Sequence, residues 1–173
     1  LRLRKGAALL GFPGVNLGAI LPAARHLARL NGHLSGVLKV HLSRGSGPRG
    51  YSPSGAKEPR LLVATSALPD SAREPKPLSV TIARHPLCSG DRLGPRKSAN
   101  KLGHILAKAE AERGGFCDAI LLNELGQAVE GTSANLIVCL GGGLVTPPLA
   151  SGCLEGVTRG VLLERGCGHG VAL

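Results

Sequence analysis

The sequence predicts a mixed α+β fold in two domains. Runs rich in β-forming residues alternate with helical patterns along the chain, which is typical of mixed α and β proteins. The 173 residues are 43% hydrophobic, enough for a packed core. Residues 85–96 have no periodicity and contain two prolines and two glycines, so we expect a linker there. The smaller N-terminal domain would be residues 1–84 and the larger C-terminal domain residues 97–173.

The smaller domain is predicted to begin with two helices and to continue as strands. Residues 3–10 resemble the end of a helix that Gly11 stops. Asn16 can cap a second helix over residues 17–30, although Pro22 would strain it. Three runs rich in β-formers are predicted as strands, at residues 36–43, 61–66 and 78–83.

The larger domain is predicted to combine one long helix with short strands. Residues 100–113 carry Leu102, Ile105, Leu106 and Ala109 on one face, which predicts an amphipathic helix. The remaining elements follow from β-rich runs and glycine-rich turns. They are strands at residues 118–122, 135–140 and 144–146, turns at residues 124–127 and 141–143, and a helix at residues 156–164.

Both ends of the chain have features of an internal segment. There is no methionine anywhere, including position 1, and a natural chain begins with one. The sequence also ends abruptly at Leu173. We therefore expect a fragment that lacks both termini of a longer protein.

The charge of the chain favours an anionic small molecule over a nucleic acid or a membrane. The formal net charge is +10, but the 21 lysines and arginines are spread along the chain without a basic block. One tyrosine and two phenylalanines offer almost no surface for stacking bases. No apolar run reaches the length of a transmembrane helix. A solvated basic surface is the plainer interpretation of the same charge.

The five cysteines indicate a reducing compartment. Their number is odd, and no two of them have the spacing of a CxxC motif. A disulfide framework or a zinc site is therefore not predicted, and reduced thiols in the cytoplasm fit best. Cys167 and His169 are close in sequence, but two ligands do not make a metal site.

Three groups occur in an order that suits pyridoxal phosphate. The Lys97 amine can form a Schiff base with an aldehyde, and the Glu130 carboxylate can keep a ring nitrogen protonated. A helix that begins with Gly156, Val157 and Thr158 can bind a phosphate at its free N–H groups. Each group alone has a plainer interpretation, as a surface lysine, an exposed strand carboxylate and an ordinary capped helix. The ordered set is the specific signal.

A glycine-rich loop in the smaller domain matches GxGxxG at Gly45, Gly47 and Gly50. We reject a dinucleotide site because Pro48 interrupts the motif and no helix follows it. The loop instead brings Arg44 and Arg49 close together in the sequence, which suits contact with an anion, although a tight surface loop explains it equally well.

These segments together resemble the class IV aminotransferase-like family, the fold type IV pyridoxal phosphate enzymes, over nearly the whole chain. Residues 97–102 resemble the segment of the Schiff-base lysine, residues 118–136 the ring-binding hairpin, and residues 146–159 the phosphate-binding turn and helix. The resemblance implies a two-domain fold like that of D-amino acid aminotransferase, pyridoxal phosphate as cofactor, and a homodimer. It also implies that the C-terminal part, residues 97–173, holds the cofactor.

The resemblance implies a role for each matched residue. Lys97 would be catalytic and would hold the cofactor, and Glu130 would face its ring nitrogen. Arg2, at the end of a helix in residues 2–7, would contact the phosphate. The other cofactor-binding residues implied by the match are Asn135, Val157 and Thr158.

Within the family, residues 36–40 and 43–52 resemble the aminodeoxychorismate lyase branch. Lys101 and Leu102 stand where many aminotransferases of the class have Asn-Tyr, which also favours the lyase. The branch implies conversion of 4-amino-4-deoxychorismate to 4-aminobenzoate and pyruvate in folate biosynthesis. Arg44 and Arg49 would then bind the two substrate carboxylates.

Two other functions remain open at this point. The first is an aminotransferase of the same class, acting on D-amino acids or branched-chain amino acids. The second is a basic binding module without catalysis, against which the presence of both Lys97 and Glu130 argues.

Overall fold

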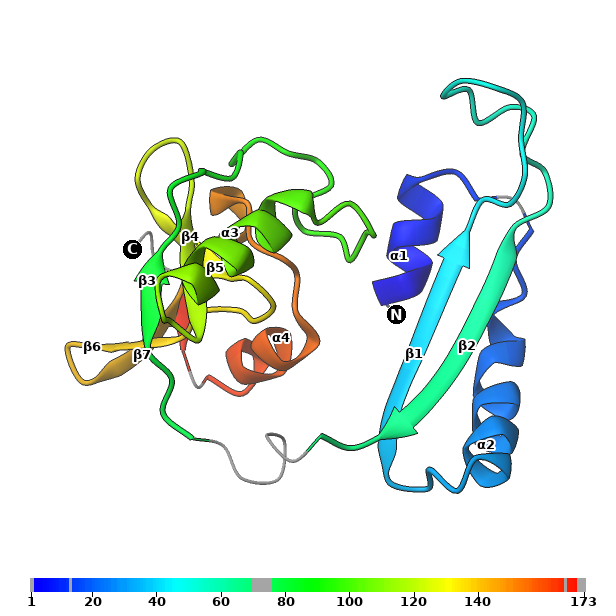
Figure 1. Ribbon diagram of the computed structural model, residues 1–173, viewed down its shortest axis with the longest axis horizontal. Helices are drawn as coiled ribbons and strands as arrows, with labels where there is room; N and C mark the ends of the chain where they lie inside the picture. The colour runs from blue at the N-terminus through cyan, green and yellow to red at the C-terminus, as the bar shows by residue number, and fades with distance from the viewer. Residues whose placement is uncertain (1, 13, 70–75, 167, 171–173) are drawn as a thin grey trace. The chain divides into compact units, whose positions relative to one another are not determined.

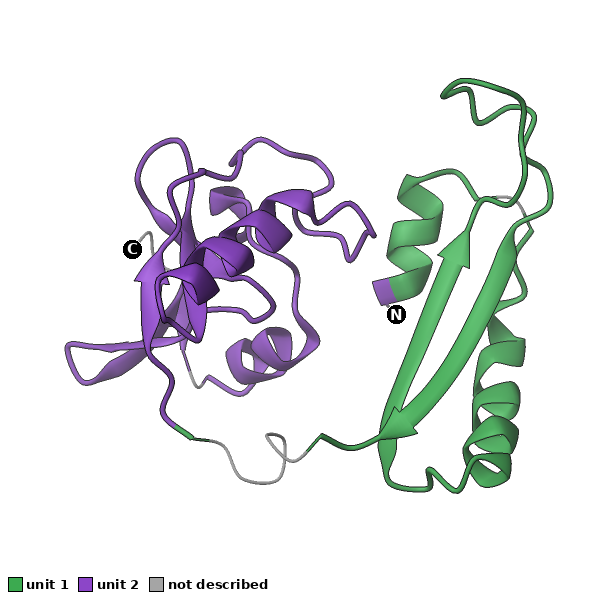
Figure 2. Cartoon of the chain, viewed as in Figure 1, with its two compact units in different colours: residues 1, 3–76 green, residues 2, 77–173 purple. Residues whose placement is uncertain are grey.

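The computed structural model describes residues 2–12, 14–69, 76–166 and 168–170, and its chain forms two compact units (Figures 1 and 2). Unit 1 comprises residues 1 and 3–76, and unit 2 comprises residues 2 and 77–173. This division falls before the linker predicted at residues 85–96, because strand β3 (Val80–Ile82) pairs with β4 (Asp118–Leu122) in unit 2. None of the helices in the described residues combines the length and the apolar character needed to cross a membrane.

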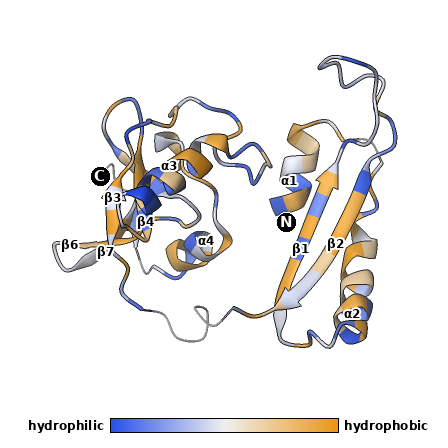
Figure 3. Ribbon diagram, in the orientation of Figure 1, coloured by the Kyte–Doolittle hydropathy of each residue, from blue (hydrophilic) through white to orange (hydrophobic). Residues whose placement is uncertain are grey.

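Unit 1 is a long β-hairpin with helices. Strands β1 (Gly36–Ser43) and β2 (Arg60–Ala67) pair antiparallel along their full length. Figure 3 shows hydrophobic stretches along both strands, in keeping with the high β-propensity of their residues. Helix α1 spans Arg2–Leu9, and helix α2 (Ile20–Leu30) packs along β2.

The predicted helix over residues 17–30 begins as a short 3₁₀ turn. Residues Leu17–Ala19 form this turn, and the Asn16 side chain accepts a hydrogen bond from the Gly18 N–H at 3.0 Å. The expected cap at Asn16 is therefore confirmed. Pro22 lies in the first turn of α2, where its missing N–H has no intrahelical acceptor to lose.

The described residues of unit 2 form two three-stranded sheets and two longer helices. In the first sheet, β3 runs parallel to β4, and β4 pairs antiparallel with β5 (Ala128–Gly131). The second sheet contains β6 (Val138–Leu140), β7 (Gly143–Thr146) and β8 (His169–Gly170). The longer helices are α3 (Leu102–Arg113), which precedes β4, and α4 (Val157–Glu164). A short 3₁₀ turn, Leu149–Ser151, lies before α4.

The face of α3 that packs is not the leucine-rich face expected from the sequence. Ala107 and Ala111 are buried against the sheet, where the core also contains Leu121. Leu102, by contrast, is 69% exposed, and Ile105 and Leu106 are similarly exposed. Small alanine side chains allow the helix to lie close to the strands, and a count of large apolar residues overlooks them.

A buried asparagine shapes the tight turn between β4 and β5. The Asn123 side-chain oxygen accepts hydrogen bonds from the N–H groups of Leu125 at 3.1 Å and Gln127 at 3.0 Å. Strand β5 was expected only as part of a hairpin, and the strand predicted at residues 135–140 is shorter than expected. Its first residue, Asn135, instead forms an isolated bridge with Glu130. The end of β5 lies beside the chain that leads into α4, where the Leu154 N–H donates to the Glu130 carboxylate.

Candidate functional site

Unit 2 contains a cavity of about 220 Å³ at the junction of three segments. The segments are the chain that precedes α3, the end of β5 with its following turn, and the loop that leads into α4. Five residues predicted from the sequence share this lining, although they are far apart in the chain. They are Lys97, Glu130, Asn135, Val157 and Thr158.

The Lys97 segment is attached to the loop that leads into α4. The Glu155 N–H donates to the Pro95 carbonyl at 3.1 Å, and the Arg96 guanidinium pairs with the Glu155 carboxylate. Both contacts fix the two residues that directly precede Lys97. Its own side chain is exposed and has no hydrogen bond or ion pair to any residue that the structure describes. The Lys97 amine is therefore available to a molecule in the cavity.

Glu130 is a buried carboxylate with both oxygens held. It is only 4% exposed, so the exposed strand carboxylate of the plainer interpretation is excluded. Its Oε1 lies 2.8 Å from His104 Nε2, and its Oε2 accepts the Leu154 N–H at 2.8 Å. A carboxylate has about four acceptor positions, so these contacts leave room for a further donor. Glu130 is thus oriented toward the cavity and can still accept a proton-bearing nitrogen.

Asn135 packs against a position that only glycine can occupy. The Asn135 Nδ2 donates to the Leu154 carbonyl at 2.9 Å. Its Oδ1 would lie 1.8 Å from a Cβ at Gly156, which no side chain could tolerate. The close approach of Asn135 and Gly156 shapes the wall of the cavity where α4 begins.

The start of α4 offers free backbone donors to an anion. Gly156 precedes the helix and makes no side-chain cap, so the N–H groups of the first turn keep their capacity to bind an acceptor. Val157 and Thr158 are exposed on this turn. Arg159 is buried beneath them and donates to the Pro147 carbonyl at 2.7 Å and to Thr146 Oγ1 at 3.2 Å. Arg159 thereby anchors the helix to β7.

A buried thiol lies beside this network. Burial raises the pKa of the Cys153 thiol, with Arg159 acting in the opposite direction. Cys153 contacts the carbonyls of Pro147 and Pro148 and packs as a small apolar group. In the described part of the chain, no three His, Cys, Asp or Glu side chains gather in a group that could hold a metal ion.

The cavity matches the chemical groups of pyridoxal phosphate. A cavity of ~150 Å³ holds a benzene ring, so about 220 Å³ has room for one substituted aromatic ring. The buried Glu130 carboxylate suits a protonated ring nitrogen, and the open start of α4 suits a phosphate. Lys97 supplies the amine that an aldehyde requires. The role of each of these residues toward the cofactor stays a prediction.

The three predicted arginines belong to other segments. Arg2 begins α1, a helix whose remaining residues belong to unit 1. Arg44 donates to the carbonyls of Leu10 and Gly11, and its guanidinium lies 4.7 Å from the centre of the Phe12 ring. Arg49 is exposed in the loop between β1 and β2. Arg44 therefore has a structural partner already, and the anion contacts of all three arginines stay predictions.

One residue of the site had no role in the sequence-based prediction. His104 lies on α3 and is the partner of the Glu130 carboxylate. The available signal was a single histidine within two helical turns of Lys97, which sequence spacing alone does not distinguish from a surface histidine. Its contact with Glu130 spans 26 residues and appears only in the folded chain.

Known proteins resemble the chain over most of its length. The sequence model of the family "Amino-transferase class IV" matches residues 1–169. Aminodeoxychorismate lyase of Vibrio harveyi is 33% identical over 132 residues, which cover 75% of this chain and 49% of that protein. The branched-chain-amino-acid aminotransferase of Escherichia coli is 26% identical over 171 residues, which cover 94% of this chain and 55% of that protein.

Solved structures show the same two kinds of relative. The 4-amino-4-deoxychorismate lyase of Pseudomonas aeruginosa matches with a TM-score of 0.79 and 30% identity, over 97% of this chain and 63% of that chain. The E. coli branched-chain aminotransferase matches with a TM-score of 0.87 over 99% of this chain and 60% of that chain, and at 24% identity it shows the fold alone. The chain spans about half the length of the curated relatives it matches.

Proposed function

Because this chain belongs to the class IV aminotransferase family, whose enzymes depend on pyridoxal phosphate, we propose that it is the cofactor-binding part of a lyase. The substrate would be 4-amino-4-deoxychorismate, and the products would be 4-aminobenzoate and pyruvate. Relatives named as lyase and as branched-chain aminotransferase both match the chain, so the choice between them depends on residues of the site.

The observation that carries the proposal is the position of Lys101. This half-buried lysine lines the same cavity as Lys97, so two primary amines border one space. Aminodeoxychorismate carries two carboxylates, and a second cation beside the reacting amine suits such a substrate. Many aminotransferases of the class have Asn-Tyr at the two positions where this chain has Lys101 and Leu102.

The residues of the chain divide the chemistry between them. When bound, pyridoxal phosphate supplies an electron sink for the bond that breaks at the amine-bearing carbon. The Glu130 carboxylate accepts a hydrogen bond from a protonated ring nitrogen and keeps that nitrogen charged. The Lys97 Nζ, once free, removes the proton from the amine-bearing carbon of the substrate. The N–H groups at the start of α4 hold the phosphate and so keep the reacting atoms beside Lys97.

A lyase differs from an aminotransferase in what it consumes. The two lyase products together contain all the atoms of the substrate, so Lys97 only has to carry a proton and no second substrate is required. An aminotransferase keeps the amino group and needs a keto acid to complete its cycle. The branched-chain aminotransferase resemblance makes that reaction the second candidate.

The test is to load the purified protein with pyridoxal phosphate and to supply aminodeoxychorismate without any keto acid. We expect 4-aminobenzoate to accumulate, measured by its fluorescence, and Lys97→Ala to lose about 10²-fold to 10⁴-fold of the rate. Product that is independent of Lys97 would contradict the proposal. An absence of product together with amino transfer from leucine or D-alanine to 2-oxoglutarate would assign the aminotransferase instead.

A further inference from the structure

The hydrogen bond between His104 and Glu130 is a contact that the proposed reaction does not use. Glu130 Oε1 and His104 Nε2 are 2.8 Å apart, and both side chains are largely buried, at 6% and 11% exposed. An ionised carboxylate can only accept, so Nε2 carries a proton and donates it. With Leu154 N–H on the other oxygen at 2.8 Å, His104 completes the pair of donors that orients Glu130.

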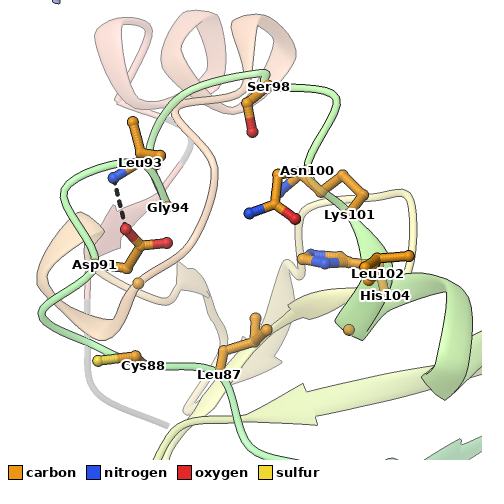
Figure 4. A pocket seen from close by; sticks show the side chains of 12 residues that line it. Leu87, Cys88, Asp91, Leu93, Gly94, Ser98, Asn100, Lys101, Leu102 and His104 are labelled. Carbon is orange, nitrogen blue, oxygen red and sulfur yellow. Dashed lines mark hydrogen bonds between the residues drawn. The ribbon is translucent and has the colours of Figure 1, made fainter. Parts of the chain in front are cut away.

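His104 also borders a second cavity. This cavity of about 160 Å³ lies beside the Lys97 segment, and Figure 4 shows the His104 ring close to Asn100 and Lys101 in its wall. His104 lines the larger cavity as well, so its ring stands between the two. One side of the ring thus faces Glu130, while the rest of it borders the second cavity, which Asp91 and Lys101 also line.

We propose that His104 is a positioning residue that holds Glu130 ionised and oriented toward the ring nitrogen of the cofactor. This inference rests on the proposed function, because it requires pyridoxal phosphate in the larger cavity. When His104 is neutral, the Glu130 carboxylate faces a single cation, the protonated ring nitrogen of the cofactor. A protonated His104 places two cations on the same carboxylate, so protonation of the histidine and of the ring nitrogen oppose each other.

Charged groups of both signs surround His104. Glu130 on β5 and Asp91 in the chain that precedes α3 are the carboxylates near its ring. Lys97 and Lys101 border the larger cavity with it. Cys88 faces the second cavity. Lys108, one turn further along α3, pairs with Glu112 at 3.4 Å. The proposal depends on a proton at Nε2, which the contact with the ionised Glu130 carboxylate requires.

The first test compares two substitutions at His104 in the cofactor-loaded protein. His104→Leu removes the donor, and we expect the affinity for pyridoxal phosphate to fall about tenfold or more, as for other hydrogen bonds to charged groups. His104→Gln keeps an N–H donor that does not titrate, so it should retain most of the affinity. Both variants should lose one pH-dependent component of the visible absorbance of the bound cofactor. His85→Gln, at an exposed histidine of the same unit, is the matched control.

A second test needs no cofactor. Nitrogen-15 spectra of the histidine rings should show the proton of His104 on Nε2. In Glu130→Gln the amide has a single acceptor oxygen, and the Leu154 N–H requires it. The amide N–H₂ would then face His104, so the ring proton should move to Nδ1. This measurement tests the contact of His104 with Glu130 even if His104→Leu fails to fold.

The outcomes separate this inference from the proposed function. Wild-type affinity and an unchanged pH profile in His104→Leu would overturn the role of His104, whether or not 4-aminobenzoate forms. An unchanged tautomer in Glu130→Gln would overturn it as well. Loss of the pH component in both His104 variants, in a protein that makes no 4-aminobenzoate, would support His104 and overturn the lyase. A protein that does not bind pyridoxal phosphate would overturn both.

Discussion

The two units of the chain differ in how much of their structure is buried. Among the described residues of unit 1, the buried hydrophobic side chains are those of Ala24 and Ala56. Unit 2 buries a core around Leu121 and Val129, together with polar groups such as Glu130 that have hydrogen-bond partners. The residues that can hold a cofactor therefore belong to the unit with the packed core. Precise placement of a carboxylate needs such support, whereas the arginines of unit 1 lie on a hairpin without it.

The largest expected effect tests this contrast in packing. Leu121→Ala should lower the free energy of unfolding by about 2–5 kcal/mol, because the side chain is fully buried in the sheet. Leu62→Ala, at a 61% exposed position of β2, should cost about 0.5 kcal/mol or less. Urea denaturation followed by circular dichroism measures both. Equal costs would show that the two units are packed alike.

Leu121→Ala should also weaken cofactor binding, since Leu121 pairs with Glu130 across the strands.

The next largest effect on stability is expected at Gly156, with Gly160 of the same region as the comparison. Gly156→Ala places a Cβ 1.8 Å from the Asn135 side chain, and we expect a loss of about 1–3 kcal/mol together with weaker binding of pyridoxal phosphate. Gly160→Ala meets nothing within 4 Å inside the helix and should stabilise the protein by about 0.5–1 kcal/mol. Thermal unfolding with and without cofactor checks both. A harmless Gly156→Ala would contradict the tight wall at this point.

A smaller effect concerns the attachment of the Lys97 segment. Arg96 and Glu155 form a partly buried ion pair, with side chains 27% and 30% exposed. The Arg96 Nε is buried without a hydrogen-bond partner in the described part of the chain, which reduces the gain from the pair. A double-mutant cycle of Arg96→Met and Glu155→Gln should give a coupling of about 1 kcal/mol or less.

The same pair of substitutions should lower the rate of the Lys97-dependent reaction by a larger factor than the loss of stability explains, since Arg96 directly precedes Lys97. Rates that follow stability alone would show that the pair has no positioning role.

The smallest effect is a pH dependence at the surface of unit 2. Hydrogen bonds from Ser89, first its hydroxyl and then its N–H, lower the pKa of Glu124 below its ordinary value of 4.5. A lowered pKa in the folded state stabilises the fold above pH 4.5, and this contribution disappears as the pH falls through the lowered value. Glu124→Gln should therefore flatten the acid limb of the stability curve slightly. An identical acid limb in the two proteins would contradict the Ser89 contacts.

Local patterns predicted much of the backbone. The strand expected at residues 36–43 coincides with β1, and the one at residues 118–122 coincides with β4. Both are short runs whose β-propensity and bounding turns agree, so nearby residues are sufficient. The packing face of α3 was not predictable in this way, because Ala107 meets Ala83 and Ala119 only after three distant segments assemble.

The same distinction, between what local sequence predicts and what only the fold determines, applies to the candidate site. Lys97, Glu130 and Thr158 could be selected by residue type and order, and they line one cavity. The burial of Glu130 and its contact with His104 depend on the packing of α3 against the sheet of β4 and β5, which local sequence does not encode. For the same reason, Arg44 appeared free in the sequence, whereas the fold gives it the carbonyls at the end of α1.

The support of Glu130 by two other segments has a consequence for ligand binding. His104 and the Leu154 N–H immobilise the carboxylate while the chain folds, before any ligand arrives. The rotamer entropy of Glu130 is thus already lost in the free protein, and binding does not have to remove it again. A substitution that loosens this support, without touching the ligand, would weaken binding through the entropy of association rather than its enthalpy. The cavity wall of unit 2 is in this sense a preorganised receptor.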